Sequence, residues 1–162
     1  WVVSGKNPLQ FLRAVSQPLV TALFTSSSAA TLPLSMQTAQ EKLGVDQARS
    51  AFVLPLGATA NMDGTALFEG IAAVFLGYMF GIDLGTTGVI AIFLVAMLSS
   101  VGAPGIPSGS MAGMQMVLLA VGIPLEAIGL LLLIERPLDT FRTAVNVEGD
   151  LVGCLVAKRF AS

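Results

Sequence analysis

Two long runs without a charged side chain constrain the fold of this chain more than any other feature. They cover residues 14–40 and 84–125, which are 27 and 42 residues long. About 20 apolar residues suffice for one helix to span a bilayer, but each run is interrupted near its middle. The first contains the hydroxyl-rich segment Thr25–Thr31 followed by Pro33, and the second contains Ser99–Ser110, which is rich in Gly, Pro and Ser. Each run therefore predicts two short helices around an irregular tip.

The composition favours a membrane environment for these runs. Hydrophobic residues make up 54% of the 162 residues and charged residues only 11%, well below the roughly 25% that is typical of soluble domains. We therefore expect an all-α, multi-pass membrane protein. Each tip should line a cavity or pack against protein, because hydrocarbon cannot hydrogen-bond exposed backbone groups. For the first run, one kinked span remains an alternative to two short helices.

Several function classes are disfavoured by what the sequence lacks. A net charge of −2 and the absence of a basic patch argue against a nucleic-acid partner. Histidine is absent, which removes the commonest general base, and the single Cys154 allows neither an internal disulfide nor a cysteine metal cluster. The segment Val147–Asp150 lacks the first glycine of the Gly-x-Gly-Asp pattern expected of an intramembrane aspartyl protease. We expect neither an enzyme nor an organic cofactor.

Polar residues interrupt the hydrophobic segment between the two runs. The pentapeptide Asn61–Thr65 (NMDGT) predicts an unwound break in a spanning helix, since Asn and Gly tolerate unusual backbone dihedrals. Asp63 and Glu69 would then lie at membrane depth, where ionisable groups are costly and are functional candidates by default. The alternative is a buried carboxylate that local donors satisfy.

A polar stripe is predicted on the last helix. Its members are spaced so that all lie within about 80° of one helix face at 3.6 residues per turn; they are Glu135, Asp139, Arg142, Asn146 and Asp150. The stripe is either a solvated face of a soluble helix or an ionisable lining inside a membrane protein. The planar fork of the Arg142 guanidinium matches a carboxylate, which could belong to a substrate or to Asp139.

The elements follow one another in a repeated order. A hairpin over 8–49 precedes a broken helix over 50–82, and a second hairpin over 84–121 precedes the last transmembrane helix over 123–160. Interrupted hydrophobic segments in corresponding positions of two halves indicate the binding site of a secondary transporter.

Four motifs carry a resemblance to a known family. They are SSSAATLP at the first tip, NMDGT in the broken helix, SSVGAPGIP at the second tip and DTFRTAVNVEGD in the last helix. Over Asn7–Phe160 the chain resembles the C-terminal half of the dicarboxylate/amino acid:cation symporters, the family of the glutamate transporters. The resemblance implies that residues 1–162 form the core of a transport domain built as a pseudo-symmetric inverted repeat. The chain begins at Trp1, and we expect a fragment whose scaffold domain is missing.

The resemblance also implies a function. It predicts a secondary symporter for aspartate or glutamate that works by elevator-type alternating access and is coupled to sodium, with protons as a further candidate coupling ion. The full-length protein would be a homotrimer in a plasma membrane, either the bacterial inner membrane or a eukaryotic cell membrane. The alternatives are a C4-dicarboxylate or neutral amino-acid symporter of the same family, or a substrate-gated channel. A purely structural membrane protein would not explain the ionisable residues at membrane depth.

Substrate and ion ligands follow from the matching motifs. Arg142 would bind the acidic side chain of the substrate and Asp139 its ammonium group. The remaining substrate-binding residues would be Ser27, Ser28, Thr65, Ile106, Ser110, Thr143 and Asn146. One sodium ion would bind Asp150 and the carbonyls of Gly57, Asn61 and Asn146. A second ion would bind the Asn61 and Asp63 side chains. A third would bind the carbonyls of Thr59, Ser100, Val101 and Ala103.

The chain departs from the family pattern at a few positions. Glu69 occupies the position of a proton-coupling glutamate, but Phe68 replaces the tyrosine that usually precedes it, which puts potassium countertransport in doubt. Glu135 replaces a common aspartate, and Ser110 replaces a position that is usually glycine-like. Pro137 is expected within the first turn or so of the last helix, where proline is tolerated.

Overall fold

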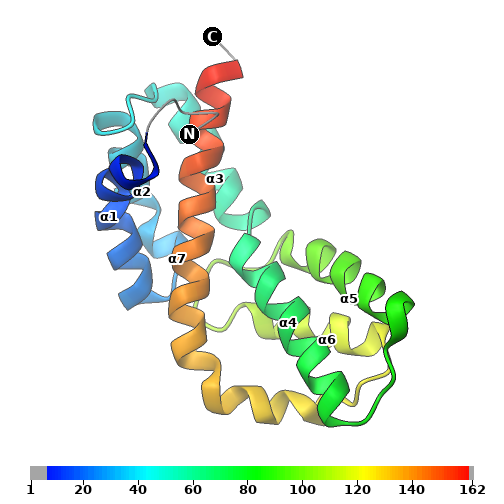
Figure 1. Ribbon diagram of the computed structural model, residues 1–162. Coiled ribbons are helices and arrows are strands. Elements are labelled where there is room, and N and C mark those ends of the chain that lie inside the picture. Colours follow the sequence, from blue (N-terminus) through cyan, green and yellow to red (C-terminus); the bar gives the residue numbers. More distant parts are fainter. Residues whose placement is uncertain (1–6, 161–162) are drawn as a thin grey trace.

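The computed structural model describes residues 7–160, and within them it shows helices and connecting segments without any β-strand (Figure 1). The prediction of an all-α protein is thereby confirmed. The outer ends of the predicted domain, residues 1–6 and 161–162, lie outside the described residues.

The first charge-free run forms two helices. Helix α1 (Pro8–Thr25) and helix α2 (Ser28–Glu41) pack against each other and are joined by two residues. Ser26 turns the chain with a left-handed φ of 49°, and the Ser27 side chain then caps α2 by accepting from the amide of Ala30. The alternative of one kinked span is therefore wrong. The tip is also shorter than the predicted segment Thr25–Thr31, because the capped helix α2 begins within that segment.

The predicted break separates the next two helices. Helix α3 (Gln47–Ala60) is followed by Asn61 and Met62, and helix α4 (Asp63–Met79) begins directly after them. The Asp46 carboxylate caps α3 by accepting from the backbone amide of Arg49 at 3.0 Å. That amide, followed by the Arg49 side chain, lowers the pKa of Asp46.

The second charge-free run also forms two helices. Helix α5 (Gly85–Ser100) and helix α6 (Ser110–Ala120) flank an irregular tip, and the short 3₁₀ helix η1 (Leu125–Ala127) precedes helix α7 (Ile128–Phe160). Ser99 and Ser100 complete α5, so this tip is also shorter than predicted. Like the first tip, it contains a serine with left-handed backbone, Ser108 at φ 60°.

Pro137 lies inside α7. The helix begins at Ile128, so the prediction of a first-turn proline is wrong. A proline ring in a helix interior removes one backbone hydrogen bond and clashes with the preceding turn, which bends the helix. Figure 1 shows α7 changing direction along its length, from the yellow segment beside α6 to the orange and red segment beside α1.

Two hydrophobic cores lie on either side of the middle of α7. One joins α1, α2 and α3 to the C-terminal half of α7 and includes Val15, Leu54 and Leu151. The other joins α4, α5 and α6 to its N-terminal part and includes Leu76 and Met114. The polar stripe of α7 follows Leu131 of the second core and continues beside Val147 and Leu151 of the first. All five of its side chains are buried.

Among the helices of residues 7–160, none combines the length and the apolar composition that a membrane span requires.

Candidate functional site

The two tips, the start of α4 and the middle of α7 enclose a small buried cavity. Its volume is about 10 Å³, about the space that one water molecule needs. Eight of the predicted substrate residues line it: Ser28, Thr65, Ile106, Ser110, Asp139, Arg142, Thr143 and Asn146. The lining also includes Ser26, Met62, Pro104, Gly105 and Gly109, which were not predicted.

Hydrogen bonds join the two tips directly. The carbonyl of Gly105 accepts from the Ser27 hydroxyl at 2.8 Å and from the Ala29 amide at 3.1 Å. Glycine is required at this crossing, since a Cβ atom on Gly105 would lie 2.9 Å from the carbonyl oxygen of Ala58. The predicted substrate residue Ser27 therefore holds the tips together and does not line the cavity.

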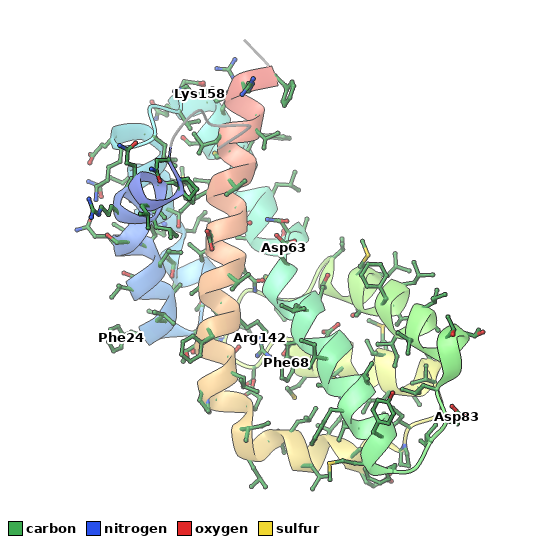
Figure 2. The ribbon with its side chains drawn as sticks, viewed as in Figure 1. Phe24, Asp63, Phe68, Asp83, Arg142 and Lys158 are labelled. Atoms are coloured by element: carbon green, nitrogen blue, oxygen red, sulfur yellow. The ribbon has the colours of Figure 1, made fainter. Side chains whose placement is uncertain are left out.

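Arg142 lies at the crossing of α7 and α4, beside Phe68 (Figure 2). It is 5% exposed, and its guanidinium carbon lies 4.5 Å from the centre of the Phe68 ring. Its Nη2 atom donates to Asp139 and, at 3.1 Å, to Glu135. A buried cation needs such neutralisation, because desolvation of an unpaired charge is costly. Nη1 has no hydrogen-bond partner within residues 7–160.

The second tip is fastened to the same two carboxylates. The backbone amide of Ser108 donates to Asp139 at 3.0 Å, and its hydroxyl donates to Glu135 at 3.1 Å. Thr143 donates its hydroxyl to the carbonyl of Asp139 at 2.8 Å. Asp139 and Glu135 therefore bind both the arginine and the tip. The sequence left the role of Glu135 open, and it predicted no role for Ser108.

Asn146 connects α7 to the start of α4. Its side-chain oxygen accepts from the amide of Gly64 at 2.8 Å and from that of Thr65 at 3.3 Å, while its nitrogen donates to the Thr65 hydroxyl at 3.2 Å. The amides at a helix start lack partners within the helix, so Asn146 caps α4 from a distant element. A Cβ atom on Gly64 would overlap the backbone of Arg142, which shows how closely the helices cross.

Residues predicted to bind sodium gather around Asp150. The Asn61 amide donates to the Asp150 carboxylate at 3.2 Å. A Cβ atom on Gly57 would overlap that carboxylate, and one on Gly149 would lie 2.6 Å from the Asp63 carboxylate. These residues line a cavity of about 620 Å³. Glu148, which was not predicted, also lines it. Figure 2 shows Asp63 facing α7 from the start of α4.

Carboxylates alone do not form a metal site here. Among residues 7–160, no three His, Cys, Asp or Glu side chains are close enough to hold a metal ion. A cation at Asp150 would therefore also depend on neutral oxygens such as backbone carbonyls, which hard cations accept readily.

The residues predicted for a third sodium ion lie on the end of α3 and on the second tip. The carbonyl of Thr59 accepts from the amide of Gly102 at 2.7 Å, so the end of α3 contacts the second tip. The carbonyl of Ser100 accepts from the Ala103 amide at 3.3 Å within that tip. The side chain of Val101 is 59% exposed and points away from the protein.

Glu69 lies outside the central cavity, between α4 and the second pair of helices. It is fully buried, and the Ser99 hydroxyl donates to its Oε2 atom. Its Oε1 atom has no partner within the described part of the chain. The absence of a side chain on Gly113 lets this oxygen approach α6, because a Cβ atom there would overlap it.

Comparisons with known proteins give a family match and several similar relatives. The model of the sodium:dicarboxylate symporter family matches residues 1–160. Excitatory amino acid transporter 3 from Mus musculus is 44% identical over 161 residues, which are 99% of this chain and 31% of that protein. Excitatory amino acid transporter 2 from Homo sapiens is 47% identical over 153 residues, 94% of the chain and 27% of that protein. A putative sodium-dependent excitatory amino acid transporter, glt-4, from Caenorhabditis elegans is 46% identical over 98% of the chain and covers 32% of that protein. The chain thus spans about a third of the length of these relatives.

Proposed function

Because the chain belongs to the sodium:dicarboxylate symporter family, we propose that the full-length protein takes up acidic amino acids together with sodium. The family consists of transporters, in agreement with the prediction that the chain is not an enzyme. The relatives are named as excitatory amino acid transporters, which supports aspartate or glutamate as substrate.

The observation that carries the proposal is the buried, half-paired guanidinium of Arg142. Its Nη1 atom has no partner in residues 7–160, and Arg142 and Asp139 both line the cavity between the tips. A substrate carboxylate would pair with Arg142, and the substrate ammonium would take the Asp139 oxygen that now accepts from Ser108. The cavity of about 10 Å³ is too small for an amino acid. The second tip therefore moves away before substrate enters and closes over it afterwards.

Sodium would bind beside this site. Asp150, Asn61 and Asp63 supply side-chain oxygens, and Gly57, Thr59 and Asn146 supply carbonyls from the segments that cross there. Asn146 lies between the two regions, because it lines the substrate cavity and caps the helix that begins at Asp63. An ion that stabilises this crossing also stabilises the substrate site. By linkage, each ligand then raises the affinity for the other.

Further features of the mechanism rest on the family. Substrate and ions would cross by an elevator-type movement, in which the tips, α4 and α7 travel as one unit, and the hydrogen bonds among these elements support such a unit. Glu69 would carry a coupled proton. The full-length transporter would be a homotrimer that passes several times through the plasma membrane, with this chain as part of the transport domain.

The direct test is uptake by the full-length transporter in proteoliposomes. We expect uptake of labelled aspartate and glutamate under an inward sodium gradient, and loss of that uptake when the gradient is removed. Uptake of serine and of succinate tests the two alternative substrate classes within the family. Preferred uptake of succinate would identify a C4-dicarboxylate symporter, preferred uptake of serine a neutral amino-acid symporter, and either would contradict the proposal.

A substrate-gated channel is the second candidate, since broken helices with polar linings can form pores. Counterflow distinguishes the two. A symporter exchanges labelled for unlabelled aspartate across a membrane that stays tight to ions, whereas a channel does not accumulate label against a gradient.

A further inference from the structure

Ser110 carries a buried hydroxyl group that no atom of the described chain satisfies. The residue is 3% exposed and is the first residue of α6. Its Oγ atom has no hydrogen-bond partner in residues 7–160, although it lines the central cavity. A buried hydroxyl without a partner is costly, and such groups in a native protein call for a ligand or a water.

Arg142 lines the same cavity, and its Nη1 atom has no hydrogen-bond partner within residues 7–160. Nη2 is already bound to Asp139 and Glu135, so Nη1 is the terminal nitrogen left for a ligand. An arginine that binds a carboxylate with its complete fork contributes two parallel hydrogen bonds. Because Nη2 is used inside the protein, the end-on fork of Nη1 and Nη2 is not free for a ligand, and a second donor beside Nη1 would complete the pair of hydrogen bonds.

We infer that Ser110 supplies this second donor and that Ser110 and Arg142 together bind the side-chain carboxylate of an acidic substrate. One carboxylate oxygen accepts from Nη1 of Arg142 and the other from the hydroxyl of Ser110. Ser110 is then a specificity-determining residue, because its hydroxyl binds a ligand with a second anionic oxygen more tightly than a ligand without one. This inference rests on the proposed transport of acidic amino acids.

The energetics of the empty site make the inference testable. The Ser110 hydroxyl makes no hydrogen bond to residues 7–160, so its removal costs no internal hydrogen bond and should leave the substrate-free protein about as stable as before or slightly more stable. The same removal should weaken the substrate complex, since a hydrogen bond to a charged group is stronger than one between neutral groups. Stability and affinity therefore change in opposite directions, which a residue needed only for folding would not produce.

The experiment compares Ser110→Ala and Ser110→Gly with the wild type in the full-length transporter. We expect the KM for L-aspartate to rise about 10-fold or more in both variants, with little change in the maximal rate. The melting temperature without substrate should stay equal or rise, while the shift produced by aspartate should shrink. Ser16→Ala is the matched control, because the Ser16 hydroxyl is exposed on α1 and donates to the carbonyl of Arg13.

L-asparagine separates a carboxylate contact from a general change of cavity shape. It keeps the shape of aspartate and lacks the negative charge, so its inhibition constant against aspartate uptake should change less than about 2-fold in Ser110→Ala. The inference is overturned if the KM for aspartate stays within about 2-fold of wild type in both variants. Equal weakening of asparagine and aspartate would also overturn it. If wild-type protein takes up aspartate while Ser110→Ala behaves like wild type, only this inference fails; if wild-type protein takes up no acidic amino acid, the proposed function fails with it.

Discussion

At the scale of single residues, Arg142 can pair with carboxylates of the protein or with the carboxylate of a substrate. Without substrate, Asp139 and Glu135 neutralise it, and Phe68 covers one face of the guanidinium. The sequence left open whether the arginine pairs inside the protein or with a substrate. The structure shows the internal pairing and leaves one nitrogen unused, so both uses are compatible with the same side chain.

Replacing Arg142 by alanine is expected to reduce aspartate uptake at least about 100-fold, because an uncompensated carboxylate would have to enter a buried site. Asp139 and Glu135 would also be left buried without a cation, which costs about 3–5 kcal/mol of stability. Uptake of labelled aspartate and a melting curve measure the two effects.

Arg136→Ala serves as the control for this substitution, because Arg136 is exposed on the same helix. Adding Glu135→Gln to Arg142→Ala removes one of the two stranded charges and should recover part of the lost stability. Aspartate uptake by Arg142→Ala at the level of Arg136→Ala would contradict the assignment of Arg142 to the substrate.

Asp150 is expected to set the sodium dependence. Asp150→Asn keeps the size of the side chain and removes its negative charge, so the sodium concentration for half-maximal aspartate uptake should rise about 10-fold or more. A sodium titration of uptake measures this. Asp83→Asn is the matched control, since Asp83 is exposed and its accepted hydrogen bond from the Gly85 amide survives in asparagine. Superimposable sodium titrations of Asp150→Asn and Asp83→Asn would rule out Asp150 as a sodium ligand.

At the scale of elements, each pair of short helices turns at a serine with left-handed backbone, Ser26 in the first tip and Ser108 in the second. Such a conformation is uncommon for a residue with a side chain. Ser108 is held there by two hydrogen bonds to α7. The second tip is therefore closed by contacts to the same carboxylates that a substrate and Arg142 would use.

Replacing Ser108 by alanine should loosen this tip. The hydroxyl bond to Glu135 is lost, the amide bond to Asp139 remains, and the unfavourable backbone conformation persists. Ser108→Gly loses the same hydroxyl bond but adopts positive φ without strain, so it should loosen the tip less. Hydrogen exchange of the amides in 101–109, measured without substrate, should rank the proteins as alanine fastest, glycine next and wild type slowest. Equal exchange in all three would show that the hydroxyl bond does not hold the tip closed.

The start of α3 should be sensitive to acid. The pKa of Asp46 is lowered in the folded protein, chiefly by the Arg49 amide that it caps. A lowered pKa in the folded state means that the cap stabilises the helix above the ordinary pKa of the carboxyl group and that this stabilisation is lost as the pH falls through the lowered value.

Asparagine caps helices as well as aspartate does but does not titrate there. Exchange of the first-turn amides of α3, taken relative to Asp46→Asn at each pH, should therefore rise in the wild type as the pH falls below about 4. A ratio that stays constant with pH would mean that the Asp46 charge does not support this helix end.

At the scale of the whole molecule, the proposed substrate and ion regions lie where two groups of helices meet. Each group has its own core, and α7 belongs to both. Large apolar side chains remain uncovered on the outside, among them Phe24, Tyr78 and Leu133, which are 87%, 77% and 83% exposed. An apolar surface of this kind is a surface for lipid or for other protein segments.

Residues 1–162 expressed alone are expected to give no uptake in proteoliposomes, whereas the full-length transporter should accumulate aspartate. The reason is that alternating access requires a second body against which the transporting unit moves, and the chain covers only about a third of its relatives. Sodium-dependent accumulation by residues 1–162 alone would contradict an elevator-type mechanism that needs a separate scaffold.

The amino-acid sequence alone was sufficient to predict the helical class, the interruptions of the charge-free runs, the break at NMDGT and the residues of the polar stripe. These features are local, since they depend on side-chain chemistry and spacing along one segment. Motif order was also sufficient to predict the family, which the comparisons confirmed.

Only the tertiary structure decided which of those polar groups meet. Asn146 caps a helix that begins 83 residues before it, and Ser108 binds Glu135 and Asp139 from another element. The close crossing of α4 and α7 at Gly64 places Asn146 beside the start of α4. The unused hydrogen-bonding atoms of Ser110 and Arg142 likewise emerge only when every other donor and acceptor has been assigned, because burial and pairing depend on the complete packing of the chain.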